Sequence, residues 1–217
     1  MTLQIIIEEI KNRRNGAISH NLSYLGLNYK VNYGVIITEL KEIADSYKYD
    51  HQLALLLYQQ EIRECKILAS MIDDPKEVTI NQMDTWSQDF TNAEIVEQTC
   101  TNLFWKSEYG LSKSIEWCLS HNDFLIKAGL ILVGRIAASD EIIKEVVFAP
   151  YIDIIDDYDE TTIASNMNNI EFALRQIALR NTTHRQKVIA IAEKMSTSNS
   201  EHRAWIGDQL LFELDSE

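Results

Sequence analysis

The scarcity of turn-forming residues constrains the fold of this chain more than any other feature. Its 217 residues include only seven Gly and two Pro. Sheets joined by many tight turns use more of both, because these residues supply the backbone angles that such turns need. Apolar residues recur at helical spacing, and no Asn-Gly or Asp-Gly hairpin lies between alternating apolar runs. The sequence therefore predicts an all-α fold.

Helical patterns follow one another along the whole chain with short polar breaks. We expect helices at residues 2–13, 31–48, 52–70, 79–87, 92–105, 109–120, 123–138, 140–157, 160–180, 183–195 and 200–214. Helices joined in this way form antiparallel pairs, which either stack as an α-solenoid or fold into an irregular bundle. A degenerate HEAT-like stack, at roughly 40 residues per pair, fits the length. No break resembles an interdomain linker, so we predict one domain over residues 1–217, with ligands bound on the concave face of the stack.

Several expected helices begin at residues that can cap them. Thr79 and Thr91 are each followed three residues later by Gln82 and Glu94, which is the pattern of a capping box. Further N-caps are expected at Asp50, Asn122, Ser139 and Ser200.

Composition and charge narrow the possible functions. The net charge of −13 opposes approach to a phosphate backbone, although a local basic groove can bind DNA on an acidic body. Three irregularly spaced cysteines form no disulfide framework and no Cys-x-x-Cys zinc motif, which favours buried free thiols. Five scattered histidines lack metal-site spacing, and no phosphate-binding glycine loop occurs, so we expect no metal and no cofactor.

The sequence shows no targeting or membrane segment. Acidic residues stand near the N-terminus, where a signal peptide would be basic and then apolar. No run approaches the roughly 20 apolar residues of a membrane span. We therefore expect a cytoplasmic protein with no membrane partner.

The segment 92–105 holds the most informative charged residue. Ala93, Val96, Cys100 and the residues that follow them at helical spacing would face a core. Glu97 lies outside that stripe, one turn into the helix, and no structural role requires it. It is either a catalytic carboxylate or a solvated one.

Two other segments carry candidate binding residues. Phe172 and Arg175 share a non-core helical face, where Arg could hold a phosphate and the ring could stack; alternatively, Phe172 packs against the next helix and Arg175 pairs with a carboxylate. Lys127 interrupts the apolar run 124–136, where it either extends its charge to the surface or points into a functional groove.

Together these stretches resemble the DNA alkylation repair family, the HEAT-like-repeat alkylpurine DNA glycosylases. The similarity runs from about residue 24 to residue 214. Its motifs are YQQEIRECKILA at 58–69, MDTW at 83–86, DF at 89–90 leading to QTC at 98–100, NLF at 102–104, FLIKAG at 124–129, IEFALRQI at 170–177 with RN at 180–181, and RAWIGD at 203–208. The resemblance implies an α-α superhelix of HEAT-like repeats whose concave face binds duplex DNA.

The resemblance also implies an activity, the excision of cationic alkylated purines such as 3-methyladenine and 7-methylguanine. The family's catalytic aspartate corresponds to Glu97, and the tryptophan four residues before it corresponds to Ala93. The family's phosphate-holding arginine corresponds to Lys127 and its second tryptophan to Phe172. Each is a departure from the family's pattern.

Two hypotheses follow from the resemblance and its departures. In the first, the protein is an alkylpurine glycosylase that uses Glu97, with Lys127, Arg175 and Arg180 in a local basic groove. In the second, the protein is a non-catalytic solenoid that binds unusual DNA structures or a protein partner.

Overall fold

The computed structural model describes residues 2–139 and 143–215, and within these ranges it is helical, with no β-strand. An isolated bridge joins Val31 to Ile62. The predicted all-α class is therefore confirmed. Contacts divide the chain into two compact units, Met1–Tyr109 and Gly110–Glu217. The single domain over residues 1–217 stays a prediction.

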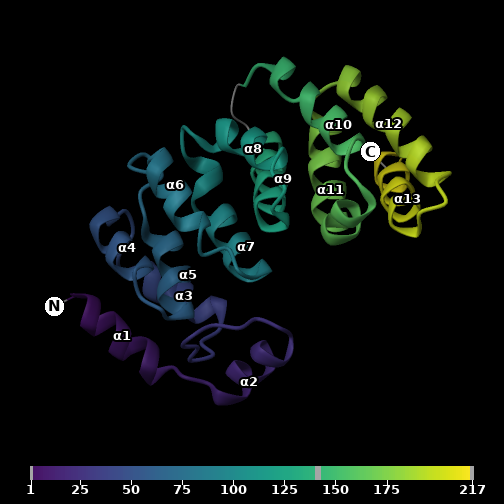
Figure 1. Cartoon of the computed structure of the whole chain (residues 1–217). Helices are drawn as coiled ribbons and strands as arrows, with labels where there is room; N and C mark the ends of the chain where they lie inside the picture. The colour runs from purple at the N-terminus through teal and green to yellow at the C-terminus, as the bar shows by residue number, and fades with distance from the viewer. Residues whose placement is uncertain (1, 140–142, 216–217) are drawn as a thin grey trace. The chain divides into compact units, whose positions relative to one another are not determined.

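The first unit contains two rows of helices that follow a short N-terminal part. Its elements are α1 (Thr2–Asn12), α2 (Gly16–Tyr24), α3 (Ile37–Ala44), α4 (His51–Tyr58), α5 (Arg63–Ile72), α6 (Ile80–Ser87), α7 (Ala93–Asn102) and the 3₁₀ turn η1 (Phe104–Lys106) (Figure 1). Helix α5 packs against α3, α4 and α7. Tyr58 of α4 stacks on Trp86 of α6, with ring centroids 3.8 Å apart. The row α3, α5, α7 therefore lies against the row α4, α6.

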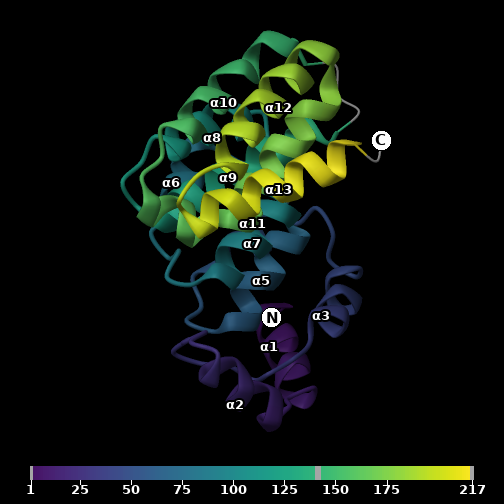
Figure 2. The same cartoon turned by 90° about the vertical axis from the view of Figure 1, so that its right-hand side faces the viewer.

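The second unit repeats this two-row arrangement. Its elements are α8 (Gly110–Cys118), α9 (Asp123–Ala137), the 3₁₀ turn η2 (Glu145–Val147), α10 (Ala149–Asp156), α11 (Glu160–Arg180), α12 (Thr182–Ser196) and α13 (Glu201–Asp215). Helices α9, α11 and α13 lie side by side, and α10 contacts both α8 and α12 (Figures 1 and 2). None of the helices described here is long and apolar enough to cross a membrane.

Most of the predicted N-caps are confirmed by hydrogen bonds. The side chains of Thr79, Asp50 and Asn122 accept from backbone N–H groups in the first turns of α6, α4 and α9. The Ser200 hydroxyl accepts from the N–H of Arg203 at 3.3 Å. These polar side chains satisfy donors that have no partner inside the helix, which fixes where each helix begins.

One predicted cap is wrong. Asn92, rather than Thr91, caps α7, because its Oδ1 accepts from the N–H of Ile95 at 3.1 Å. The hydroxyl of Ser139 donates to the carbonyl of Ile136 at 2.8 Å, and the helix start that Ser139 was predicted to cap lies outside the described residues. The predicted helix 140–157 begins at residues outside the described ranges, and its described part becomes η2 and α10.

The predicted helices 31–48 and 52–70 are also wrong in their bounds. The second of them is broken between α4 and α5, where the N–H of Val31 donates to the carbonyl of Glu61 and the N–H of Arg63 donates to the carbonyl of Val31. These bonds form the bridge between Val31 and Ile62, whose backbone is extended, and α5 starts directly after it at Arg63. Helix α3 begins only at Ile37. The sequence analysis did not predict α2, none of whose residues is buried.

Candidate functional site

Helix α7 presents Glu97 on its exposed surface. Its neighbours Val96, Thr99 and Cys100 are buried. Ala93, one turn before Glu97 on the same face, is half-buried. Among the described residues, the Glu97 carboxylate has no hydrogen-bond or ion-pair partner. The predicted position of Glu97 outside the apolar stripe is therefore confirmed, and its carboxylate is accessible.

The neighbouring carboxylate, Glu94, is held in a buried ion pair. Arg63 donates from Nε to Glu94 Oε2 at 2.7 Å and from Nη2 to Oε1 at 2.6 Å, which is a bidentate contact. The Arg63 residue is only 2% exposed. Burial lowers the pKa of Arg63, but the Glu94 and Glu64 carboxylates together outweigh burial and raise that pKa, so the guanidinium stays charged. Glu94 therefore serves the fold, whereas Glu97 is uncommitted.

The same network fixes the loop between α2 and α3 against α7. The Tyr29 hydroxyl donates to Glu94 Oε2 at 2.8 Å. Burial, reinforced by the charge of Glu94, raises the pKa of Tyr29 well above its ordinary value, so the hydroxyl remains a donor. Arg63 also donates to the carbonyl of Val35 at 2.9 Å, and the fully buried Glu64 accepts from the N–H of Val35 at 3.2 Å. The first turn of α7 is consequently anchored to two other segments.

Lys127 lies on α9 between the buried residues Ile126 and Ala128, and it is itself half-buried. Within the described chain its ammonium has no ion pair. Helix α9 approaches α8 closely, because a Cβ at Gly129 would lie 2.7 Å from the carbonyl oxygen of Ser114. Lys127 thus carries an uncompensated charge on a tightly packed helix.

Phe172 and Arg175 of α11 make contacts within their own unit. The Phe172 ring lies against α9 at Gly134, where an added Cβ would come within 2.5 Å of the ring carbon Cε1. Arg175 donates from Nε to Glu171 at 2.7 Å, and its guanidinium carbon lies 6.0 Å from the centroid of the Phe172 ring. Phe172 thus packs against a neighbouring helix and Arg175 pairs with a carboxylate, and neither contact tests the binding roles predicted for them.

Arg180 joins three segments of the second unit. Its Nη2 donates to Glu145 Oε1 at 2.8 Å and its Nη1 to the carbonyl of Ser139 at 3.1 Å. Its guanidinium carbon also lies 5.2 Å from the centroid of the Phe148 ring. The hydrogen bond from Arg180 is the main reason that the pKa of Glu145 falls below its ordinary value. Arg180 thus links the end of α11 to η2 and to the end of α9.

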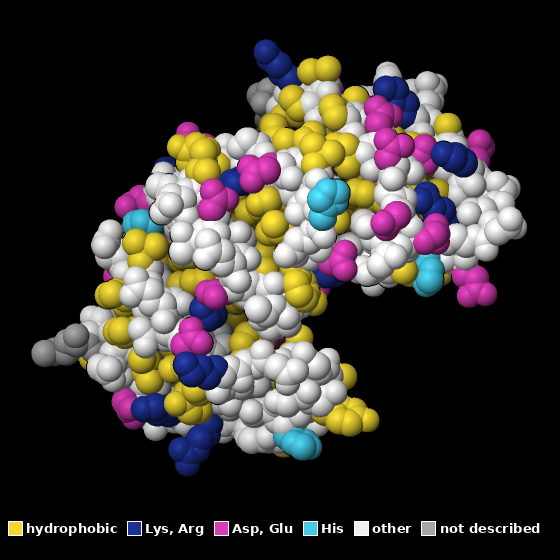
Figure 3. All heavy atoms as spheres, in the orientation of Figure 1, with side chains coloured by type: hydrophobic (Ala, Val, Ile, Leu, Met, Phe, Trp, Pro, Cys, Tyr) yellow, Lys and Arg dark blue, Asp and Glu magenta, His cyan; other side chains and the backbone are white. Residues whose placement is uncertain are grey.

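The candidate residues are divided between the two units. Ala93 and Glu97 lie on α7 of the first unit, and Lys127 lies on α9 of the second. Phe172, Arg175 and Arg180 all lie on α11, which packs against α9. On the face of each unit seen in Figure 3, basic side chains are interspersed with acidic ones. No contact tests the roles predicted for these residues, which stay predictions.

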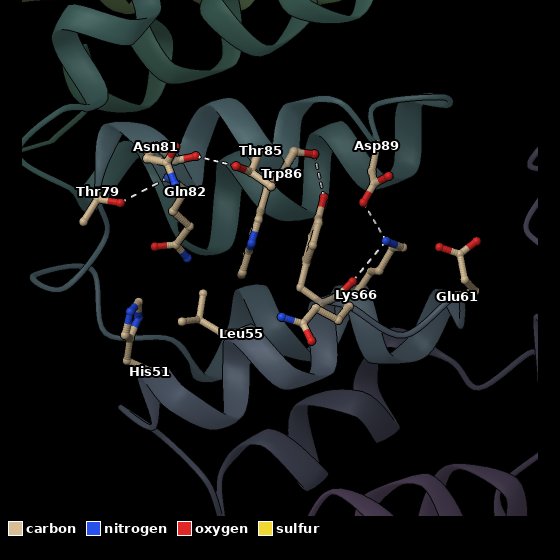
Figure 4. Close-up of a pocket in the computed structure, with 12 residues that line it drawn as sticks. His51, Leu55, Glu61, Lys66, Thr79, Asn81, Gln82, Thr85, Trp86 and Asp89 are labelled. Carbon is tan, nitrogen blue, oxygen red and sulfur yellow. Dashed lines mark hydrogen bonds and ion pairs between the residues drawn. The ribbon is translucent and has the colours of Figure 1, made fainter.

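A separate cavity of about 410 Å³ opens on the first unit between α4 and α6. Leu55, His51 and Thr85 are among its lining residues (Figure 4). At one end Lys66 pairs with Asp89 at 2.7 Å. None of the candidate residues named from the sequence lines this cavity. The described residues also contain no group of three or more His, Cys, Asp and Glu side chains that could hold a metal ion.

Comparison with known proteins places this arrangement in a class. A solved structure described as "a new family of proteins related to the HEAT-like repeat DNA glycosylases with affinity for branched DNA structures" superposes with a TM-score of 0.79 at 15% identity, over 99% of this chain and 94% of that one. The fold is thus that of the HEAT-like-repeat proteins. Residues 6–202 match the model of the family described as "DNA alkylation repair enzyme". The chain belongs to the DNA alkylation repair enzyme family. No curated protein matches it significantly.

The sequence did not reveal the residues that position α7. Arg63 lies inside the motif at 58–69, but nothing in that pattern indicates that its guanidinium is buried against Glu94. Tyr29 lies outside every motif. Both were missed because each acts through a contact with Glu94, which lies 31 positions after Arg63 and 65 positions after Tyr29.

Proposed function

We propose that this protein binds duplex DNA and excises cationic alkylated purines of the 3-methyladenine or 7-methylguanine type, with Glu97 as its catalytic carboxylate. The supporting observation is that Glu97 is exposed and its carboxylate has no partner among the described residues, whereas Glu94 is fixed by Arg63. An uncommitted carboxylate presents its full charge to a positive centre that develops nearby. Membership in the DNA alkylation repair enzyme family supports the substrate class.

The proposed reaction breaks the N-glycosidic bond of the lesion. The bond's electron pair leaves with the cationic base, which becomes neutral, and positive charge develops on the sugar. Glu97 stabilises that charge and orients the water that attacks the anomeric carbon; the water's proton passes to solvent. Lys127 supplies a point charge for a backbone phosphate. Arg175 would leave its ion pair with Glu171 and bind a second backbone phosphate. In this proposal Arg180 belongs to a local basic groove with Lys127 and Arg175, all three within the second unit, and it keeps its internal contacts.

A second candidate function is non-catalytic binding of branched DNA or of a protein partner through the same helices. Two observations favour it. Ala93 provides no aromatic wall before Glu97, and the Phe172 ring is packed against Gly134. The structurally similar protein is also described as having affinity for branched DNA.

Release of methylated base from alkylated duplex DNA distinguishes these functions. We expect the wild-type protein to release base and Glu97→Gln to lower the rate by on the order of a hundredfold, because the substitution removes the stabilising charge. Glu77→Gln is the matched control, since Glu77 is exposed and unpartnered in the described part of the same unit. Equal rates for Glu97→Gln and the control would refute the role of Glu97. DNA binding without any release would favour the second function.

Placing an aromatic side chain at position 93 tests the same site by a substitution that should raise the rate of base release. Ala93→Trp places an indole ring one turn before Glu97 on the same face of α7. Aromatic contacts contribute about 0.5–1.5 kcal/mol, so we expect release to rise severalfold. The measurement is the single-turnover rate with saturating protein. A rate that stays at the wild-type value, with DNA affinity also unchanged, would show that position 93 does not face the lesion.

A further inference from the structure

The acidic residues of this chain are distributed unevenly. Asp and Glu number 33 and the net charge is −13, yet residues 10–38 contain neither. We call these residues the acid-free segment. It carries Lys11, Arg13, Arg14, His20 and Lys30. A cationic stretch on a strongly acidic protein attracts polyanions locally, where the whole molecule repels them.

The middle of the acid-free segment is poorly covered by the rest of the protein. Helix α2 buries no residue, and at its end Tyr24 is 86% exposed and Leu25 is 73% exposed. Gly26 then turns the chain with φ +82°. On the surface around α2, Figure 3 shows no acidic side chain on the visible face. Two adjacent large side chains, Tyr24 and Leu25, therefore project from a segment that itself carries no acidic residue.

Two of the cations in this segment are available to a ligand. Lys11 and Arg13 are already paired with Glu8 and Glu42, both at 2.7 Å. Arg14 is exposed and has no side-chain partner among the described residues. The Lys30 ammonium is only loosely paired, at 3.9 Å from Glu61.

The acid-free segment is also tied to the helix that carries Glu97. Tyr29, which precedes Lys30, donates to Glu94 at 2.8 Å. Glu94 and Glu97 are three residues apart on α7, so they lie on neighbouring parts of one helical face. The loop that bears Lys30 therefore borders the face from which Glu97 projects.

We propose that the acid-free segment is a second DNA-binding surface beside Glu97. Arg14 and Lys30 bind phosphates, and Tyr24 and Leu25 stack against unpaired bases of a branched or mismatched DNA. Charge complementarity favours nucleic acid over a protein partner, and every base offers a face on which a tyrosine ring stacks. This proposal rests on the DNA binding of the proposed function, but not on base excision.

Salt-dependent binding of the full chain tests the phosphate contacts. The variant Arg14→Gln/Lys30→Gln is compared with Lys76→Gln/Lys187→Gln, which removes two exposed cations outside the segment. Fluorescence anisotropy is measured on a plain duplex and on a three-way junction between low and moderate salt. We expect the first variant to bind both DNAs more weakly and its salt slope to fall by about 0.9 for each lost duplex phosphate contact. We expect the control variant to match the wild type.

Binding preference tests the stacking residues. The variant Tyr24→Ser/Leu25→Ser is compared with Tyr49→Ser/Leu119→Ser, whose side chains are also largely exposed. We expect the first variant to lose about fivefold or more in affinity for the junction, while its affinity for plain duplex stays near the wild-type value. Unchanged thermal midpoints would show that each variant is folded.

The possible failures lead to different conclusions. If both segment variants bind every DNA as the wild type does, this proposal is overturned and the proposed function stands. If the wild-type protein binds no DNA, both are overturned. If Tyr24→Ser/Leu25→Ser instead changes the sedimentation mass of the free protein, the surface is a contact between copies of this chain, and the proposal is likewise overturned.

Discussion

Replacing Arg63 with Met should destabilise the first unit strongly. The side chain of Arg63 makes two bonds to Glu94, one to Glu64 at 3.0 Å and one to the carbonyl of Val35 at 2.9 Å. Methionine fills a similar volume, so the substitution removes the charge and the donors without opening a large cavity. It leaves two carboxylates without their common cation.

The size of the effect follows from the burial of the groups left behind. Removing one partner of a buried ion pair costs about 3–5 kcal/mol. Glu94 keeps its bond to Tyr29 and its side chain is 14% exposed, while Glu64 keeps two backbone donors. These remaining contacts place the expected loss near the lower end, at about 3 kcal/mol. Because the partners are coupled, Arg63→Met/Glu94→Leu should cost about 1–3 kcal/mol less than the sum of the single changes.

Urea unfolding, followed by circular dichroism, measures this free energy. Arg14→Met is the matched control, and since Arg14 is exposed and unpartnered among the described residues its expected effect is within about 0.5 kcal/mol. A loss below about 1 kcal/mol for Arg63→Met, or additive effects in the double variant, would show that the Arg63–Glu94 contact does not stabilise the native state.

Two further predictions concern the packed interior. Burial raises the pKa values of Cys65 and Cys118 to about 12 from 9.0, and it also raises that of the fully buried Cys100. These thiols should resist a chromogenic disulfide reagent until urea unfolds the protein. Because the thiols of the unfolded protein lose their protons at lower pH than the buried ones, the free energy of unfolding should fall as pH rises from about 9 toward 12. Rapid labelling of the folded protein would contradict their burial. At Gly207 an added Cβ would lie 2.4 Å from the carbonyl oxygen of Ala192, so Gly207→Ala should separate α12 from α13 and cost about 1–3 kcal/mol in thermal unfolding. Gly16→Ala, which meets no atom within 4 Å, is the control, and equal midpoints would refute the close approach.

The sequence predicted those helices whose local pattern and packing agree. Thr79 and Asn122 cap α6 and α9 as expected, because a cap needs only its own side chain and the next few backbone groups. Helix α2 escaped prediction because it buries nothing. The break before α5 depends on Val31, which is about thirty positions away and which no local pattern specifies.

The sequence predicted where the candidate residues lie on their helices better than it predicted which residues they contact. Glu97 stands on the exposed face where helical periodicity placed it. The Thr91–Glu94 capping box was wrong because Glu94 binds Arg63, a contact stronger than the cap it replaces. Arg180, predicted for a basic groove, is surrounded by acceptors that come from distant segments. Long-range partners decide such cases, and periodicity carries no information about them.

The absence of a side chain at Gly134 determines how a substitution at this position would affect the Phe172 ring. The Phe172 ring lies where a Cβ of residue 134 would otherwise stand, so a single added methyl group would displace it. Residue 134 therefore determines whether the Phe172 ring can keep its present contact with α9. An inherited exchange of this glycine for alanine would shift the surface around Phe172 from behind, without a substitution at any exposed position.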